Sequence, residues 1–230
     1  MGEDPGVKRG LTLRAADLIA ERPPGTSDDI HFTEALAESV ILHTTEVGDV
    51  VLDPFAGYGT TVVVAERLDR RAIGVELLPE HLEIVRSRTA GRARLVLGDA
   101  RELLGLVDEP VDLVFTSPPY MPSADHPENP LTGYATNDGD YATYLRQLGS
   151  VFAQAAMLLR PGGQLVVNVA NVVAADGRLT PLASDIAQVI AEHLTLLGTT
   201  TLEWDEQPAG LAGDYLLWFS RGEPRSRDLP

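Results

Sequence analysis

Four consecutive residues, Ser117, Pro118, Pro119 and Tyr120, combine groups that can hold an amine and present it for reaction. The serine hydroxyl and the proline carbonyls accept hydrogen bonds, and neither proline carries an N–H group that would compete for them. Because two successive prolines cannot continue a central β-ladder, the backbone must leave its sheet at this point. The motif therefore predicts an acceptor-rich loop at the edge of a sheet.

Such a loop is suited to an exocyclic amino group of a nucleobase, which is a poor nucleophile because its lone pair is conjugated with the ring. If the Ser117 hydroxyl and the Pro118 carbonyl accept its two hydrogens, the nitrogen is drawn toward tetrahedral geometry and can attack a sulfonium methyl group. Positioning would then supply most of the acceleration. The Tyr120 ring could stack on a base flipped out of a duplex. The alternative is a Pro-Pro turn with a core tyrosine.

A second run of residues predicts a tight turn between a strand and a helix, next to a ligand. Its glycines, Gly57 and Gly59, allow the backbone to approach a ligand closely. Position 62 is Val62, where a dinucleotide fingerprint has its third glycine, and this disfavours a pyrophosphate ligand. The candidate cofactor-binding residues of the run are Asp53, Pro54, Phe55, Gly57, Gly59, Thr60 and Thr61.

Two acidic residues follow at the ends of the next expected strands. Glu76 can accept hydrogen bonds from both hydroxyls of a ribose, and Asp99, followed by Ala100, can accept from an adenine amino group. Their order after the glycine turn indicates a pocket for an adenosine group without phosphates, as in S-adenosylmethionine. The alternative is that Asp53 and Asp99 are helix N-caps and that the glycines form ordinary turns.

The elements that must position these residues alternate between strands and helices. Strands are expected at residues 50–55, 72–77, 93–97, 111–116, 164–171, 199–206 and 215–220, and helices at 60–70, 79–89, 141–159 and 182–197. This order predicts an α/β fold with a seven-stranded, mostly parallel sheet covered by helices on both faces. Ligands bind such sheets beyond the carboxyl ends of the strands. Residues 11–221 are expected to form a single domain between flexible ends, 1–10 and 222–230.

The segment 121–140 is polar and directly follows the Ser-Pro-Pro-Tyr motif. It contains Pro122, Pro127 and Pro130. This composition and position predict a lid that closes over the substrate and is mobile without it.

The charge composition of the chain limits the partners that it is expected to bind. The chain has 230 residues and a formal net charge of -16, with 18 Lys plus Arg against 34 Asp plus Glu. Proteins that bind nucleic acid unaided normally show a basic surface, so we expect weak, salt-sensitive binding by the isolated chain and specific binding only with a homodimer or a partner protein. The sequence shows no membrane span, signal peptide, cysteine or metal-like histidine spacing, so we expect a cytoplasmic protein without a metal.

These motifs together resemble the amino-methyltransferases that make N4-methylcytosine or N6-methyladenine in DNA, over about residues 29–220. The resemblance implies a class I, Rossmann-like methyltransferase fold, S-adenosylmethionine as cofactor and a nucleic-acid substrate, DNA more than RNA. It also implies that His31, Phe32 and Thr33 lie beside the methionine end of the cofactor. Serine at the first motif position, rather than Asp or Asn, is closer to the cytosine-N4 enzymes.

Three features depart from that family's pattern. The cofactor motifs precede the Ser-Pro-Pro-Tyr motif, position 58 is the bulky Tyr58, and no target-recognition domain is apparent. Four alternatives therefore stay open: a tRNA or other RNA methyltransferase, a small-molecule amine methyltransferase, a non-catalytic cofactor-binding subunit, and an NAD-dependent oxidoreductase, which Val62 disfavours.

Overall fold

A mixed β-sheet runs through the protein in the computed structural model, which describes residues 11–26, 32–121, 126–137, 139–174, 177–206 and 211–223. Nine strands are found in this part of the chain, in the order β1-β8-β9-β6-β5-β2-β3-β4, with β7 paired to β6. β9 is antiparallel to β6 and β8, and β7 is antiparallel to β6, whereas the other pairs are parallel. The strands are β1 (Leu11–Leu13), β2 (Val50–Asp53), β3 (Arg71–Glu76), β4 (Arg94–Leu97), β5 (Val111–Thr116), β6 (Leu159–Val173), β7 (Leu179–Thr180), β8 (Thr195–Trp204) and β9 (Leu211–Ser220).

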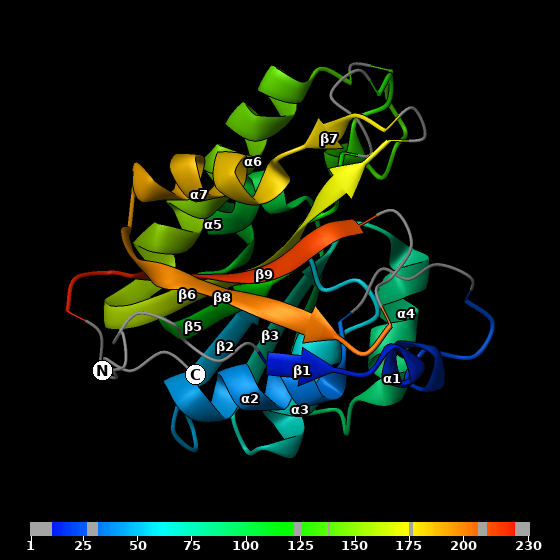
Figure 1. Cartoon of the computed structure of the whole chain (residues 1–230). Helices are drawn as coiled ribbons and strands as arrows, with labels where there is room; N and C mark the ends of the chain where they lie inside the picture. Colours follow the sequence, from blue (N-terminus) through cyan, green and yellow to red (C-terminus); the bar gives the residue numbers. More distant parts are fainter. Residues whose placement is uncertain are drawn as a thin grey trace, which may run out of the picture.

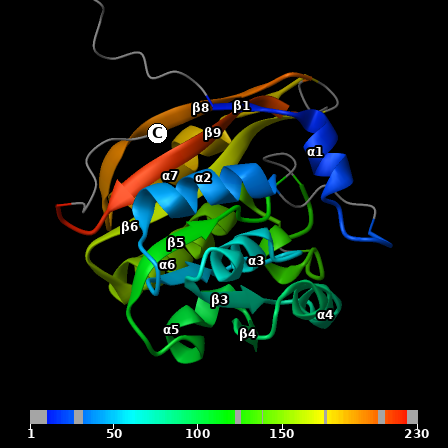
Figure 2. The same ribbon diagram turned by 90° about the horizontal axis from the view of Figure 1, so that it is seen from below.

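Helices cover both faces of this sheet. In Figure 1, α6 and α7 lie above the strands and α2 and α3 lie below them, and Figure 2 shows α2 and α3 side by side on the lower face. The α-helices are α1 (Ala15–Ala20), α2 (Glu34–Thr44), α3 (Thr60–Arg67), α4 (Pro79–Arg88), α5 (Leu103–Leu106), α6 (Tyr141–Leu158) and α7 (Leu182–Ala191), and short 3-10 helices are η1 (Ala100–Glu102) and η2 (Pro130–Thr132). Within the described residues, no helix is long and apolar enough to cross a membrane.

The central strand β5 shows why the sheet needs helices on both sides. All its residues are buried. Val114 packs into the hydrophobic cluster under α6 and α7, whereas its neighbours Leu113 and Phe115 pack into the cluster under α2 and α3. Because successive side chains of a strand point to opposite faces, a run of apolar residues must be covered twice. This confirms the predicted α/β class.

The predicted number of seven strands is wrong. Each of the seven expected strands is present, and β1 and β7 are additional. β1 has three residues and β7 has two, so neither is long enough to show an alternating pattern. They are strands because they pair with β8 and β6, which local sequence does not reveal.

The helices also differ in part from expectation. The helix expected at residues 182–197 ends at Ala191, because residues from Thr195 onward pair with β9 as part of β8. α2 was not expected as a helix. It begins at an N-cap, Thr33, whose side chain accepts a hydrogen bond from the Leu36 amide at 3.3 Å.

Candidate active site

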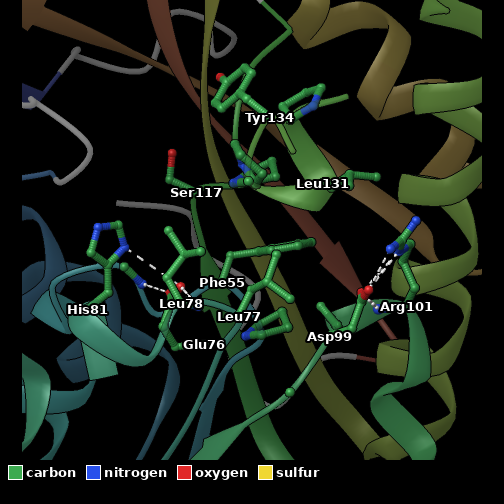
Figure 3. Close-up of a pocket in the computed structure, with 18 of the residues that line it drawn as sticks. Phe55, Glu76, Leu77, Leu78, His81, Asp99, Arg101, Ser117, Leu131 and Tyr134 are labelled. Atoms are coloured by element: carbon green, nitrogen blue, oxygen red, sulfur yellow. Dashed lines mark hydrogen bonds and ion pairs between the residues drawn. The ribbon is translucent and has the colours of Figure 1, made fainter. Parts of the chain in front are cut away.

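A cavity of about 460 Å³ opens beyond the carboxyl ends of β2, β3, β4 and β5 (Figure 3). Each of these strands is followed at once by residues that line it: Phe55 after β2, Leu77 after β3, Asp99 after β4 and Ser117 after β5. The volume lies within the range of small-molecule and cofactor pockets. The cavity is therefore at the sheet edge where the fold predicts a ligand.

The glycine turn at the end of β2 depends on both of its glycines. Gly57 has a φ of 53° and Gly59 a φ of 83°, which side chains with a Cβ rarely adopt. A Cβ on Gly59 would also lie 2.5 Å from Val85 Cγ1 on α4. Directly after the turn, the Thr60 hydroxyl is buried and has no hydrogen-bond partner in the described part of the protein. A buried hydroxyl left unpaired carries a desolvation cost.

Glu76, at the end of β3, is buried and faces the glycine turn. Its Oε2 accepts from the Gly57 amide at 2.7 Å, and its Oε1 accepts from the Leu78 amide at 2.9 Å. His81 Nδ1 lies 3.7 Å from Oε1 (Figure 3). Each carboxylate oxygen has a second acceptor position, so this arrangement fixes the carboxylate while it can still accept hydroxyl groups of a ligand.

Asp99, at the end of β4, is held by a neighbouring cation. Arg101 donates to it from its backbone amide and from its guanidinium, with Nη2 at 2.6 Å from Oδ2. Burial alone would raise the pKa of Asp99, but the hydrogen bonds and charge of Arg101 lower it below its ordinary value. The site therefore presents an ionised acceptor at this strand end, with a cation beside it.

Asp53, at the end of β2, is buried and links the segments that follow β2 and β5. Its Oδ1 accepts from the Phe55 amide at 3.0 Å and from the Thr116 hydroxyl at 2.6 Å. Burial raises the pKa of Asp53 to about 6, against the opposing effect of hydrogen bonds from Thr116, Thr61 and Phe55. This carboxylate connects the residue before the glycine turn with the residue before the Ser-Pro-Pro-Tyr motif.

Two tyrosine hydroxyls occupy carbonyls of the Ser-Pro-Pro-Tyr motif. Tyr144 donates to the Pro119 carbonyl at 3.0 Å, and Tyr134 donates to the Tyr120 carbonyl at 2.8 Å. Burial raises the pKa of both tyrosines, which keeps them protonated as donors. No described residue donates to the carbonyl of Pro118, which lines the cavity. Among the described residues, the Pro118 carbonyl therefore keeps both of its acceptor positions open, and Ser117 lines the cavity beside it.

The Tyr120 side chain is anchored to β6. Its hydroxyl accepts from the buried Ala170 amide at 3.1 Å and lies 3.3 Å from the Ser117 hydroxyl oxygen. β5 ends at Thr116, which pairs with Val167 of β6. The Ala170 amide lies beyond this end of β5, and the Tyr120 hydroxyl serves as its hydrogen-bond acceptor. The ring is thereby fixed while it lines the cavity.

The described part of segment 121–140 is anchored in the core, contrary to the expected mobile lid. Met121 and Leu131 are buried in the cluster under α6, and η2 is closed by a hydrogen bond from the Asn129 amide to the Thr136 carbonyl at 3.0 Å. Such packing ties residues 129–131 to the core, whereas residues 133–137 are exposed. Residues 122–125 and 138 lie outside the described residues.

The structure brings most of the sequence-predicted site residues to one cavity. Those that line it are Pro54, Phe55, Gly57, Glu76, Asp99, Ala100, Ser117, Pro118, Pro119 and Tyr120. Those that do not line it are Phe32, Thr33, Asp53, Gly59, Thr60 and Thr61. Phe32 packs on Phe115 with ring centroids 4.7 Å apart, and Thr33 caps α2, so both have structural roles. His31 lies outside the described residues.

Sequence reasoning missed several residues that line the cavity. Leu77, Leu78 and Arg101 directly follow or lie close to predicted site residues, so their proximity was a usable signal. Leu131 and Tyr134 come from the segment after the motif, and only tertiary packing places them here. The sequence therefore predicts the lining residues near the strand ends better than those that come from the segment after the motif.

The fold is that of Rossmann-like methyltransferases. TrmN from Thermus thermophilus matches with a TM-score of 0.62 at 18% identity, covering 83% of this chain and 49% of TrmN. The N-methyltransferase NodS from Bradyrhizobium japonicum matches with a TM-score of 0.56 at 15% identity, covering 83% of this chain and 94% of NodS. At such identities the likeness concerns the fold alone.

Sequence comparisons find a family model and several methyltransferases that resemble parts of the chain. A family model described as DNA methylase matches residues 21–87. The type II methyltransferase M2.DpnII from Streptococcus pneumoniae is 54% identical over 55 residues, which are 24% of this chain and 20% of that protein. The type II methyltransferase M.BglII from Bacillus subtilis is 35% identical over 117 residues, covering 44% of this chain and 32% of that protein. The matched stretches thus span a fifth to a third of these relatives.

Proposed function

We propose that this protein is an S-adenosylmethionine-dependent N-methyltransferase that methylates an exocyclic amino group of a base in DNA, cytosine N4 or adenine N6. The observation that carries the proposal is the state of the Ser-Pro-Pro-Tyr loop. Hydroxyls of Tyr144 and Tyr134 each take one acceptor position of the Pro119 and Tyr120 carbonyls, whereas the Pro118 carbonyl accepts from no described residue and lies beside Ser117 at the cavity wall. Two acceptors match the two hydrogens of an amino group.

The residues around the cavity fit the cofactor. Glu76 would hold the ribose hydroxyls, Asp99 and Ala100 the adenine, and the glycine turn the methionine portion. The open acceptor positions of Glu76 support a polar ligand there, and the missing third glycine supports one without a pyrophosphate. When bound, the cofactor supplies a methyl group on a positively charged sulfonium.

The chain's own residues would activate the amine by holding it. If Ser117 and Pro118 accept both N–H hydrogens, they draw the nitrogen toward tetrahedral geometry and so take its lone pair out of conjugation with the base. Tyr120, whose hydroxyl is tied to Ala170, offers its ring as a fixed surface for that base. Since the loop is braced before substrate binds, little reorganisation is needed at reaction.

Several observations bear on the nucleic acid. The relatives named above are type II methyltransferases, and the family model is one for DNA methylases, which favours DNA over RNA. The net charge of -16 favours weak binding by the isolated chain, with a second copy or a partner protein supplying the grip. That charge also favours a second candidate, a cofactor-binding subunit without its own catalysis.

The experiment that tests the proposal offers labelled methyl groups on the cofactor to duplex DNA, tRNA and free nucleosides in parallel, followed by digestion to identify the product. The proposal expects N4-methylcytosine or N6-methyladenine from DNA. Methyl label found only in tRNA, or only in nucleosides, would show that this compound and not DNA is the substrate. Cofactor binding without transfer to any of the three would favour the non-catalytic subunit.

A further inference from the structure

Tyr134 has an unfavourable backbone conformation for its residue type. Its φ is 61°, and among the described residues the only other non-glycine with positive φ is Asp69. Asp tolerates the left-handed region better than a bulky aromatic does. Residues held in such conformations cluster at functional sites, where the surrounding structure enforces them.

The surrounding turn enforces this conformation. The Tyr134 amide donates to the Asn129 carbonyl at 3.1 Å, and the preceding Gly133, with a φ of 64°, donates to the Pro130 carbonyl at 3.1 Å. Asn129 is itself buried, and its side chain accepts from the Leu131 amide at 3.0 Å. The turn therefore holds Tyr134 in place from the core side.

The strained backbone presents an aromatic ring to the cavity. Tyr134 lines the cavity yet is 40% exposed, and its ring meets that of His126 edge to face with centroids 5.9 Å apart. Figure 3 shows Tyr134 on the same side as Ser117, with Glu76 and Asp99 toward the other side. Glycine suits the left-handed region better, so what favours tyrosine here is its side chain, whose hydroxyl reaches the Tyr120 carbonyl and whose ring lines the cavity.

We propose that Tyr134 binds the target base and positions the Ser-Pro-Pro-Tyr loop, an inference that rests on the proposed function. Its ring forms the outer wall of the base site, on the opposite side of the cavity from the cofactor-binding strand ends. Its hydroxyl, 2.8 Å from the Tyr120 carbonyl oxygen, takes one of the two acceptor positions of that carbonyl and so lowers its competition for the substrate. The amino group is then directed to the Pro118 carbonyl and Ser117.

Two substitutions separate the ring from the hydroxyl. Tyr134→Gly removes both and relieves the left-handed strain, so Tm should stay within a few degrees of the parent while KM for DNA rises about ten-fold or more. Tyr134→Phe keeps the ring but frees the Tyr120 carbonyl, so kcat should fall about three-fold or more while KM changes less than two-fold. Cofactor affinity should hold in both. Asp69→Gly, at the other left-handed position and away from the cavity, is the matched control and should retain parental kcat and KM.

Methyl transfer by the parent protein tests the proposed function, and the kinetics of Tyr134→Gly test the role of Tyr134. If the parent methylates DNA and Tyr134→Gly has parental KM and kcat, Tyr134 has no role in the base site, and the proposed function stands. The same conclusion follows if Tyr134→Gly lowers Tm without changing KM. If the parent transfers no methyl group to any nucleic acid, the proposed function and this inference fall together.

Discussion

The hydroxyl of Thr116 donates to Oδ1 of Asp53 across 2.6 Å, inside the sheet. Asp53 ends β2 and Thr116 ends β5, so one short hydrogen bond joins the strand before the glycine turn to the strand before the Ser-Pro-Pro-Tyr motif. Neighbouring strands alone would leave the two loops free to shift relative to each other. The bond couples the candidate cofactor site to the candidate amino-group site.

This buried carboxyl gives the first prediction. Because the pKa of Asp53 is about 6 in the folded chain and 3.8 without its surroundings, the folded state binds a proton between about pH 4 and pH 6 that the unfolded chain has lost. The free energy of unfolding therefore falls as pH rises through this window, by roughly 3 kcal/mol. Asp53→Asn should remove this fall, so its Tm relative to the parent should increase from pH 4 to pH 7. A difference that does not vary with pH would contradict the assignment.

Glu76 gives the second prediction. Its carboxylate holds the Gly57 and Leu78 amides and is the candidate acceptor for ribose hydroxyls. Glu76→Gln replaces one acceptor oxygen by a donor, so cofactor affinity measured by calorimetry should weaken by about 1–3 kcal/mol, or roughly 5- to 150-fold. The exposed Glu80→Gln on α4 is the control and should bind like the parent. Equal affinity for Glu76→Gln would remove Glu76 from the site.

The third prediction concerns Tyr120→Phe. The sequence alone predicts a mild effect of this substitution on substrate capture, because the ring is kept. In the structure, however, the Tyr120 hydroxyl is the acceptor for the Ala170 amide, which is buried. Its loss should lower the free energy of unfolding by about 1–3 kcal/mol in denaturant titrations. A variant as stable as the parent would show that the hydroxyl is not needed there.

Much of the site could be predicted because it follows local rules. β5 has the boundaries expected from its apolar run, and Glu76 and Asp99 lie at strand ends as expected. α2 was missed although its buried residues recur at helical spacing after the Thr33 cap, so the signal was present. The placement of Tyr134 and the link between Asp53 and Thr116 join residues distant in sequence, and no local pattern encodes them.

The fourth prediction concerns nucleic-acid binding. Many arginines already pair with carboxylates, namely Arg67, Arg71, Arg86, Arg88, Arg92, Arg94, Arg101 and Arg160. Together with the net charge of -16, these ion pairs disfavour the neutralisation of phosphates, so the isolated chain should bind duplex DNA weakly. Because binding through phosphate contacts releases counterions, the affinity should also fall steeply between about 50 and 200 mM salt. Fluorescence anisotropy can measure this. Sub-micromolar binding by a monomer at physiological salt would contradict it.

The most direct test of the amino-group site is single-turnover methyl transfer by Ser117→Ala beside its cofactor affinity. The substitution removes the Ser117 hydroxyl, one of the two proposed acceptors for the amino group, and leaves the other, the Pro118 carbonyl. Transfer to the parent's best substrate should fall about ten-fold or more, on the order of the 1–3 kcal/mol that a lost acceptor costs, while cofactor affinity stays at the parent's value. Transfer at the parental rate would contradict the proposal, because the Ser-Pro-Pro-Tyr loop would then be a turn with no part in the chemistry.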